Sequence, residues 1–208
     1  MKYYPAFLNL KDKKAVVAGG GKVAERKALS LLNAGAAVKV ISPDITENLR
    51  KLKKKGSIKH IKRNYRKGDL KDAFLVVAGT SSAEINLKIA QEAQYLVNVI
   101  DAPSEGNYIV PSIVRRGTLA IAISTEGVSP AVSKAVRQEI ERLYGKEFAL
   151  YLKFVEQIRK EAREKIKNDR TRAKFLKSLA SEELFTDVRN KGFRAAYKKI
   201  RSSLNSIK

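Results

Sequence analysis

The sequence predicts an α/β protein whose first half is a doubly wound parallel sheet. Short apolar runs rich in β-branched residues alternate with helical patterns from residue 14 to about residue 100. This alternation is typical of parallel strands that are connected by helices. A glycine-rich turn follows the first apolar run and begins the first helical pattern. We therefore expect a Rossmann-like unit, in which ligands bind at the carboxyl ends of the strands.

The glycine-rich turn is the most informative motif of the chain. The run Ala15–Ala18 leads into Gly19-Gly20-Gly21-Lys22-Val23-Ala24, which fits the G-x-G-x-x-G/A pattern of dinucleotide sites. Gly19 permits the tight turn, Gly21 lets the backbone approach a pyrophosphate, and Ala24 lets the helix lie close to the strand. A glycine turn without a ligand is the alternative. The complete strand–helix–strand unit, which Gly35 closes before the run 38–41, favours a nucleotide site.

Polar residues follow the later apolar runs, at the strand ends where ligands are expected. Ser42-Pro43-Asp44 follows the second run, Gly79-Thr80-Ser81-Ser82 follows the run 74–78, and Asp101 follows the run 96–100. An acid that binds the ribose usually ends the second strand of an NAD enzyme. Here Ser42 takes that place and Asp44 lies two residues later, so this feature leaves NAD and NADP both open. Asp101 is expected in the same crevice as the glycine turn and Thr80, although aspartate here is also a common turn or cap residue.

The run 58–61 is expected to be a weak, edge-like third strand. It contains His60, the only histidine of the chain. Alternation places this residue on one face of a short edge-like strand, where a structural role is a stronger expectation than a catalytic one.

From residue 109 onward the pattern changes to one further strand and then helices. Residues 113–118 end in a polar turn, and 119–123 is an apolar run. Ser129 before Pro130 predicts the start of a helix. One side of that helix carries Val132, Val136, Ile140 and Leu143. An apolar stripe of helical period follows over 147–166, and shorter helices are expected from residue 181 and over 193–200.

Composition excludes several classes of protein. The chain has 208 residues and no cysteine, which excludes disulfides, thiol catalysis and cysteine-ligated metal. No apolar run approaches the length of a membrane span, and the first residues lack the pattern of a signal peptide, so we expect a cytoplasmic protein without a membrane. The 43 basic and 21 acidic residues leave a net charge of +22, denser over 148–208. Such a charge attracts polyanions, although a lysine-rich solvated surface is an equal alternative.

Several motifs together resemble the precorrin-2 dehydrogenase family, which includes the N-terminal module of sirohaem synthases. They are Leu8-Asn9-Leu10, the run from Val16 to Lys27, the run from Gly35 to Pro43, Asn98-Val99-Ile100-Asp101-Ala102-Pro103, Pro111-Ser112, and Ile123-Ser124-Thr125-Glu126-Gly127-Val128-Ser129-Pro130. The resemblance covers roughly residues 5–145 and is far more specific than the glycine turn alone. It implies an NAD-dependent oxidation of precorrin-2 to sirohydrochlorin. Some members of the family also insert ferrous iron to give sirohaem.

The resemblance also implies an organisation and a set of functional residues. It implies an NAD-binding domain over 1–112 and a segment over 113–147 that forms the interface of a homodimer. For residues 148–208, the helical pattern and the charge predict a basic helical domain. Asp101 matches the essential aspartate of the family, the general base or proton acceptor. The implied cofactor contacts are Gly19, Gly20, Gly21, Lys22, Val23, Ser42, Pro43 and Thr80. The family often has an acid after this threonine, where the chain has Ser81, so the resemblance fixes the fold but not the finer cofactor contacts.

The sequence also offers candidate residues for contacts with the substrate and with iron. Precorrin-2 is a polycarboxylate, for which Arg115, Arg116 and Lys134 are candidate partners, with plain surface charge as the alternative. Ser124 and Thr125 are the other expected substrate contacts. We expect no resident metal, and iron insertion would have to use Asp101 as well, because His60 is the only histidine.

Two other classes of function are compatible with parts of the sequence. A regulatory module that senses NAD would need the glycine turn, but it has no evident need for an aspartate at a strand end. A nucleic-acid-binding protein would suit the basic charge, but the chain has no stacking-aromatic motif and no recognition-helix pattern.

Overall fold

A computed structural model of the chain describes residues 2–207. The chain divides into two compact units, Met1–Val110 and Pro111–Lys208. This division lies two residues before the domain boundary that the sequence predicts after residue 112. The further boundary after residue 147 stays a prediction.

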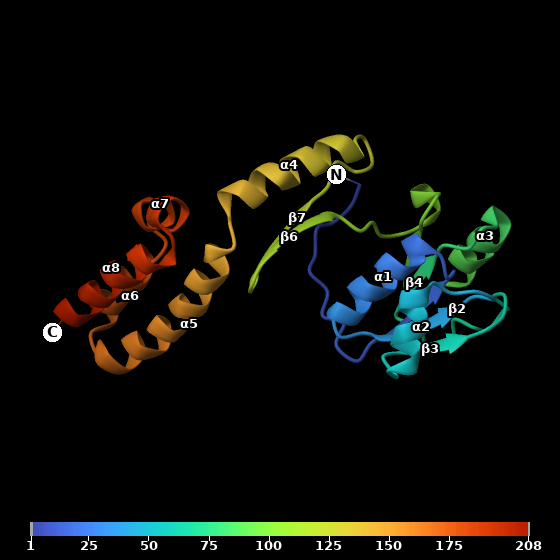
Figure 1. The fold of residues 1–208 in the computed structure, drawn as a ribbon, viewed down its shortest axis with the longest axis horizontal. Coiled ribbons are helices and arrows are strands. Elements are labelled where there is room, and N and C mark those ends of the chain that lie inside the picture. Colours follow the sequence, from blue (N-terminus) through green and yellow to red (C-terminus); the bar gives the residue numbers. More distant parts are fainter. Residues whose placement is uncertain (1, 208) are drawn as a thin grey trace. The chain divides into compact units, whose positions relative to one another are not determined.

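The amino-terminal unit contains the predicted parallel sheet (Figure 1). Its strand order is β3-β2-β1-β4-β5, and every neighbouring pair is parallel. The strands are β1 (Lys14–Ala18), β2 (Ala37–Ile41), β3 (Ile58–Ile61), β4 (Leu75–Ala78) and β5 (Leu96–Val99). The chain reverses its direction of winding between β3 and β4, which brings β4 beside β1. The predicted α/β fold is confirmed, and β3 is an edge strand as expected.

Helices cover both faces of this sheet. They are α1 (Lys22–Asn33), α2 (Glu47–Lys54) and α3 (Ala83–Glu92), with a short 3₁₀ turn η1 (Pro103–Glu105) after β5. On one face, Ala24 and Ala28 of α1 and Leu49 of α2 are buried in the same core as alternate residues of the strands. On the other face, Ile89 of α3 is buried with the strand residues whose side chains point to that face, such as Val16 and Val76. This arrangement brings the loops after β1, β2 and β4 to one edge of the sheet.

The carboxy-terminal unit is a β-hairpin followed by helices (Figure 1). The hairpin consists of β6 (Ser112–Arg116) and β7 (Leu119–Ile123), which are antiparallel. Helix α4 (Pro130–Leu143) begins as predicted, because the Ser129 side chain accepts a hydrogen bond from the Val132 N–H at 3.2 Å. The other helices are α5 (Glu147–Lys165), α6 (Asp169–Ser178), α7 (Glu182–Lys191) and α8 (Phe193–Ser206). The first hairpin strand and α6 are the two elements that the sequence pattern does not place.

One aromatic-rich core holds helices α5 to α8 together. Phe148, Tyr151 and Phe154 of α5 are at most 4% exposed, and residues of α6, α7 and α8 are buried with them. The Tyr151 hydroxyl donates to the Leu179 carbonyl, so this buried polar group has a partner.

Candidate dinucleotide site

The glycine turn after β1 has the backbone that its sequence predicts. Gly19 has a φ of +122°, and a Cβ atom there would lie 2.1 Å from the Gly79 carbonyl oxygen. A Cβ atom at Gly20 would lie 1.9 Å from the Asp44 carbonyl oxygen. Any side chain at these two positions would collide with the loops after β4 and β2. At Gly21, by contrast, a Cβ atom would meet nothing within 4 Å, so a ligand can approach this backbone.

The amino terminus of α1 is free to bind an anion. Gly21 is the N-cap residue, and no side chain caps this end of the helix. The N–H groups of the first turn and the positive end of the helix dipole therefore face the open space above Gly21. Ala24 is 2% exposed and lets the helix lie directly on the sheet. These features fit a dinucleotide pyrophosphate.

A cavity of about 530 Å³ lies at this edge of the sheet. It brings together residues from the loops after β1, β2, β4 and β5, as the parallel topology requires. Every predicted cofactor contact and the predicted catalytic aspartate line it: Gly19, Gly20, Gly21, Lys22, Val23, Ser42, Pro43, Thr80 and Asp101. Asn64, Tyr65 and Ile85, which the sequence pattern does not single out, line it as well.

Asn86 fixes the loop that carries Thr80. Its Oδ1 atom accepts hydrogen bonds from the Thr80 backbone N–H at 3.0 Å and from the Thr80 hydroxyl at 2.8 Å. Its amide nitrogen donates to the Thr80 carbonyl at 3.1 Å. Asn86 is 3% exposed and lies on α3, which Ser82 caps by accepting from the Ile85 N–H. A polar residue between the apolar Ile85 and Ile89 is the only sequence signal that could have identified it.

Tyr65 forms another wall of the cavity. Its hydroxyl donates to the Glu92 carboxylate on α3, and a second oxygen of Glu92 accepts from the Gly68 N–H at 2.6 Å. Burial and the contact with Glu92 raise the pKa of the Tyr65 hydroxyl, so the phenol stays neutral. Tyr65 lies in a segment without a regular element, where no periodic pattern could predict its position.

The end of β2 is polar but not acidic. Ser42 is 8% exposed, and its carbonyl oxygen accepts a hydrogen bond from His60 Nε2 at 2.9 Å. His60 thus connects β3 to the end of β2, which supports the structural role expected for it. Asp44 is exposed at the rim of the cavity.

Asp101 is an exposed carboxylate just beyond β5. The chain after it turns back along β5, where the Asn107 side chain accepts from the Val97 N–H at 2.8 Å. The buried Asn98 side chain donates to the Tyr108 carbonyl at 3.2 Å. A Cβ atom at Gly106 would lie 2.7 Å from the Val97 carbonyl oxygen. This close return anchors the segment that begins at Asp101.

The predicted substrate contacts all belong to the carboxy-terminal unit. The Thr125 hydroxyl accepts from the Ser129 N–H at 3.2 Å, and the Ser124 hydroxyl accepts from the Glu126 N–H at 3.0 Å, so both shape the loop before α4. Arg115 and Lys134 are exposed.

Arg116 is bound to the backbone of its own unit. It donates to the carbonyl oxygens of Tyr144 at 2.6 Å, Arg115 at 2.8 Å and Glu141 at 3.3 Å. These bonds show a structural role for Arg116 at the carboxyl end of α4. A contact between Arg116 and substrate stays a prediction.

Comparisons with known proteins decide the family. A family model described as NAD(P)-binding matches residues 6–112, and one described as a central part of a sirohaem biosynthesis protein matches residues 116–143. The precorrin-2 dehydrogenase of Bacillus subtilis is 33% identical over 158 residues, which are 75% of this chain and 98% of that protein. The chain belongs to the precorrin-2 dehydrogenase family. The resemblance drawn from the motifs is confirmed, and so is a nicotinamide dinucleotide as the class of cofactor.

Longer relatives of this family are siroheme synthases. That of Methylobacillus flagellatus is 39% identical over 166 residues, which are 76% of this chain and 36% of that protein. Siroheme synthase 3 of Aeromonas hydrophila is 31% identical over 207 residues, which are 98% of this chain and 44% of that protein. The chain thus spans less than half the length of these two relatives.

A solved structure supports the fold assignment. The structure named SirC, precorrin-2 dehydrogenase, has a TM-score of 0.81 and 24% identity, and the match covers 96% of this chain and all of that one. Within residues 2–207, no group of three or more histidine, cysteine or acidic side chains could hold a metal ion. Over the same residues, no helix has the length and apolar character of a membrane span.

Proposed function

We propose that this chain oxidises precorrin-2 to sirohydrochlorin, with NAD as the hydride acceptor. A single observation carries the proposal. One cavity, in a chain of the precorrin-2 dehydrogenase family, is lined by the glycine turn, by Thr80 and by a carboxylate, Asp101. An oxidation that removes a hydride and a proton needs a dinucleotide cradle and a proton acceptor in one place.

The residues of the cavity divide this work between them. The N–H groups at the start of α1, around Gly21, bind the pyrophosphate, and the loop held by Asn86 presents Thr80 to the dinucleotide. Bound NAD supplies a hydride acceptor. Asp101 accepts the proton that leaves the substrate carbon, and its exposure lets that proton pass on to water.

Exposed cations support binding of a polycarboxylate substrate. The chain carries a net charge of +22, which raises the local concentration of any polyanion. Arg115 and Lys134 are exposed and can contact substrate carboxylates, and Ser124 and Thr125 lie in the loop that precedes α4. Single substitutions of Arg115 and Lys134 by glutamine should raise KM for precorrin-2 more than they lower kcat.

The experiment that tests the activity is an anaerobic incubation of the purified chain with precorrin-2 and NAD. NADH and the sirohydrochlorin spectrum should appear together and in equal amounts. NAD binding without turnover would refute the enzyme and favour the NAD-sensing alternative. Salt-dependent binding to DNA without NAD binding would favour the nucleic-acid alternative.

Iron insertion is a second candidate activity, favoured by the siroheme synthase names of several relatives. Ferrous iron would be a substrate, and the carboxylate of Asp101 would accept the pyrrole protons. An anaerobic assay with sirohydrochlorin and ferrous iron, without NAD, isolates this step. An insertion rate equal to the rate without protein would refute it.

We also propose that the chain forms a homodimer in the cytoplasm, through the hairpin and α4. Val132, Val136 and Leu143 lie along α4 and are 51%, 36% and 44% exposed, and Ile113 of the hairpin is 39% exposed. An apolar face of this kind is typical of a subunit interface.

The test of the dimer is the mass in solution. Light scattering during gel filtration should give the dimer mass for the wild-type chain and the monomer mass for the double variant Val132→Glu, Val136→Glu. Leu87→Glu, at an equally exposed leucine of α3, should stay dimeric. A monomeric wild-type chain would refute the dimer.

A further inference from the structure

The amino-terminal unit has a second recess, at the opposite end of the strands from the glycine turn. It has a volume of about 430 Å³ and lies over the first residues of β1, β2 and β3. Four of its lining residues are lysines: Lys14, Lys39, Lys59 and Lys71. None of the described residues that line it is acidic.

Strand register places three of these lysines on one face of the sheet. Lys39 of β2 lies opposite Lys59 of β3 and opposite Val16 of β1. Lys14 lies two residues before Val16 and therefore on the same face. Adjacent strands are about 4.8 Å apart, and like charges directly opposite each other are destabilising.

This part of the sheet face is open because no helix covers it. The connection between β3 and β4 forms no helix in the described structure, where doubly wound sheets usually have one. Leu70 and Ala73 of this connection are buried against Val16 and Val76, but the face beside them carries Lys39 and Lys59.

Among the described residues, no carboxylate forms an ion pair with Lys39, Lys59 or Lys71. The Lys39 ammonium donates to the backbone carbonyl of Asp69 at 2.6 Å, whereas both carboxylate oxygens of Asp69 accept from Arg63 at 2.7 Å. Lys14 pairs with Asp72 at 3.2 Å, and both side chains are more than 60% exposed. Burial lowers the pKa of the Lys39 ammonium, and the charges of Lys59, Arg63 and Lys14 lower it further, while Asp69 opposes them.

We propose that this recess is a binding site for a small multivalent anion with two or more phosphate or carboxylate groups. Such an anion would accept hydrogen bonds from Lys39, Lys59 and Lys71 together and would remove their mutual repulsion. The alternative is that the lysine stems only cover apolar sheet surface while the ammonium groups stay in water. An anion site in the recess predicts saturable binding that depends on these lysines, whereas lysine stems that only cover the sheet predict no saturable binding of an anion.

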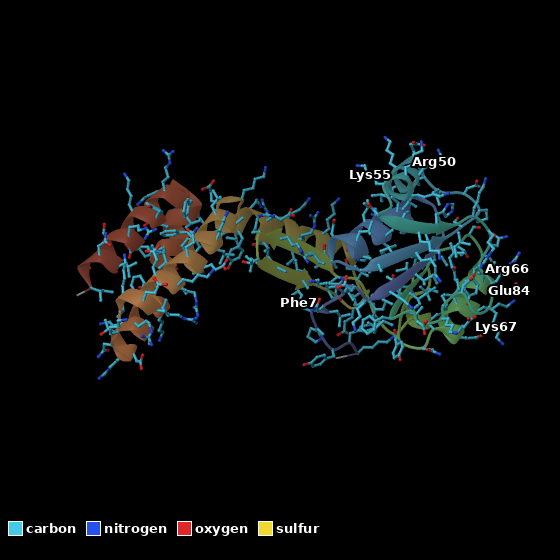
Figure 2. All side chains as sticks on the ribbon, turned by 90° about the horizontal axis from the view of Figure 1, so that it is seen from below. Phe7, Arg50, Lys55, Arg66, Lys67 and Glu84 are labelled. Atoms are coloured by element: carbon cyan, nitrogen blue, oxygen red, sulfur yellow. The ribbon has the colours of Figure 1, made fainter. Side chains whose placement is uncertain are left out.

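The test is a calorimetric titration of the full chain with pyrophosphate and, separately, with citrate, at constant ionic strength. Saturating NAD is present throughout, so that the glycine turn cannot bind the pyrophosphate. The test variant is Lys39→Gln, Lys59→Gln. The control is Lys53→Gln, Lys54→Gln, which removes the same charge from α2, on the other face of the sheet. The side chains of Arg50 and Lys55, which flank this pair, extend away from the sheet into solvent (Figure 2).

The wild-type chain and the control should bind one of the two anions with saturation, and the test variant should bind it at least about tenfold more weakly. Saturation with pyrophosphate alone would identify a phosphate site, and saturation with citrate alone a carboxylate site. Retained NAD binding shows that the test variant is folded. If the double variant does not bind NAD, the single variant Lys59→Gln is tested in its place. Equal affinities for test and control, or no saturation with either anion, would overturn the proposal.

Discussion

Asn86 holds Thr80 through three hydrogen bonds, and these bonds connect α3 to the loop that lines the dinucleotide cavity. The bonds use the backbone N–H, the carbonyl and the hydroxyl of Thr80. Because Asn86 is 3% exposed, water cannot replace its amide. The geometry of Thr80 in this cavity therefore depends on a residue that does not itself line the cavity.

Replacing Asn86 with leucine should weaken NAD binding and destabilise the amino-terminal unit. The apolar side chain would remove the partner of the Thr80 N–H and of the Thr80 carbonyl, at about 1–3 kcal/mol for each group that stays away from water. The Thr80 hydroxyl would keep its hydrogen bond to the Ser82 carbonyl at 3.1 Å. NAD affinity, measured by calorimetry, should fall at least about tenfold, and urea unfolding should show the loss of stability. Asn86→Asp is the matched variant, because its carboxylate still accepts from the Thr80 N–H and hydroxyl. It should retain most of the affinity. Wild-type affinity in Asn86→Leu would contradict the positioning role.

The sequence predicts the framework of the site because that framework depends on local patterns. The turn after the first strand requires Gly19, and Asp101 directly follows a strand. The place of each residue in the site can therefore be predicted from its neighbours in the sequence. Asn86 and Tyr65 escape prediction for the opposite reason. Asn86 is one polar residue within a helical pattern, and Tyr65 lies in an irregular connection. Their roles depend on side-chain contacts, of Asn86 with Thr80 and of Tyr65 with Glu92 of α3, that no periodic pattern indicates. The pairing of Lys39 with Lys59 likewise needs the strand register.

Replacing Asp101 with asparagine should abolish most of the proposed oxidation and leave cofactor binding intact. Asparagine has nearly the same size but cannot accept a proton, so the loss should fall on kcat, by at least about 100-fold. NAD titration should give an affinity within about twofold of the wild-type chain. Asp72→Asn, in the exposed pair with Lys14, is the control and should keep full turnover. Near-normal turnover in Asp101→Asn would remove Asp101 from the mechanism.

Replacing Arg116 with glutamine should destabilise the carboxy-terminal unit. The change removes charge-assisted hydrogen bonds to the carbonyls of Tyr144 and Glu141, at the end of α4 where a cation also favours the helix dipole. Bonds of this kind are worth about 1.5–3 kcal/mol. Urea unfolding followed by circular dichroism should show this loss, whereas Arg115→Gln, at the exposed neighbour, should leave stability unchanged. Equal stability of the two variants would show that the bonds to α4 contribute nothing.

Asp187 of α7 should make the carboxy-terminal unit sensitive to acid. This carboxylate is 4% exposed and pairs with Lys199 of α8 and, at 3.0 Å, with Lys191. Hydrogen bonds from Lys199 and then Lys191 lower the pKa of Asp187 below its ordinary value.

A carboxyl group whose pKa is lower in the folded state stabilises the fold above its unfolded pKa, and this contribution disappears as the pH falls through the folded pKa. Asp187→Asn should therefore be less stable than the wild-type chain at neutral pH, and the difference should shrink below about pH 4. Urea unfolding at a series of pH values measures it, with Asp169→Asn, at a mostly exposed carboxylate, as the control. A difference between Asp187→Asn and wild type that is the same at every pH would show that the ion pairs do not account for it.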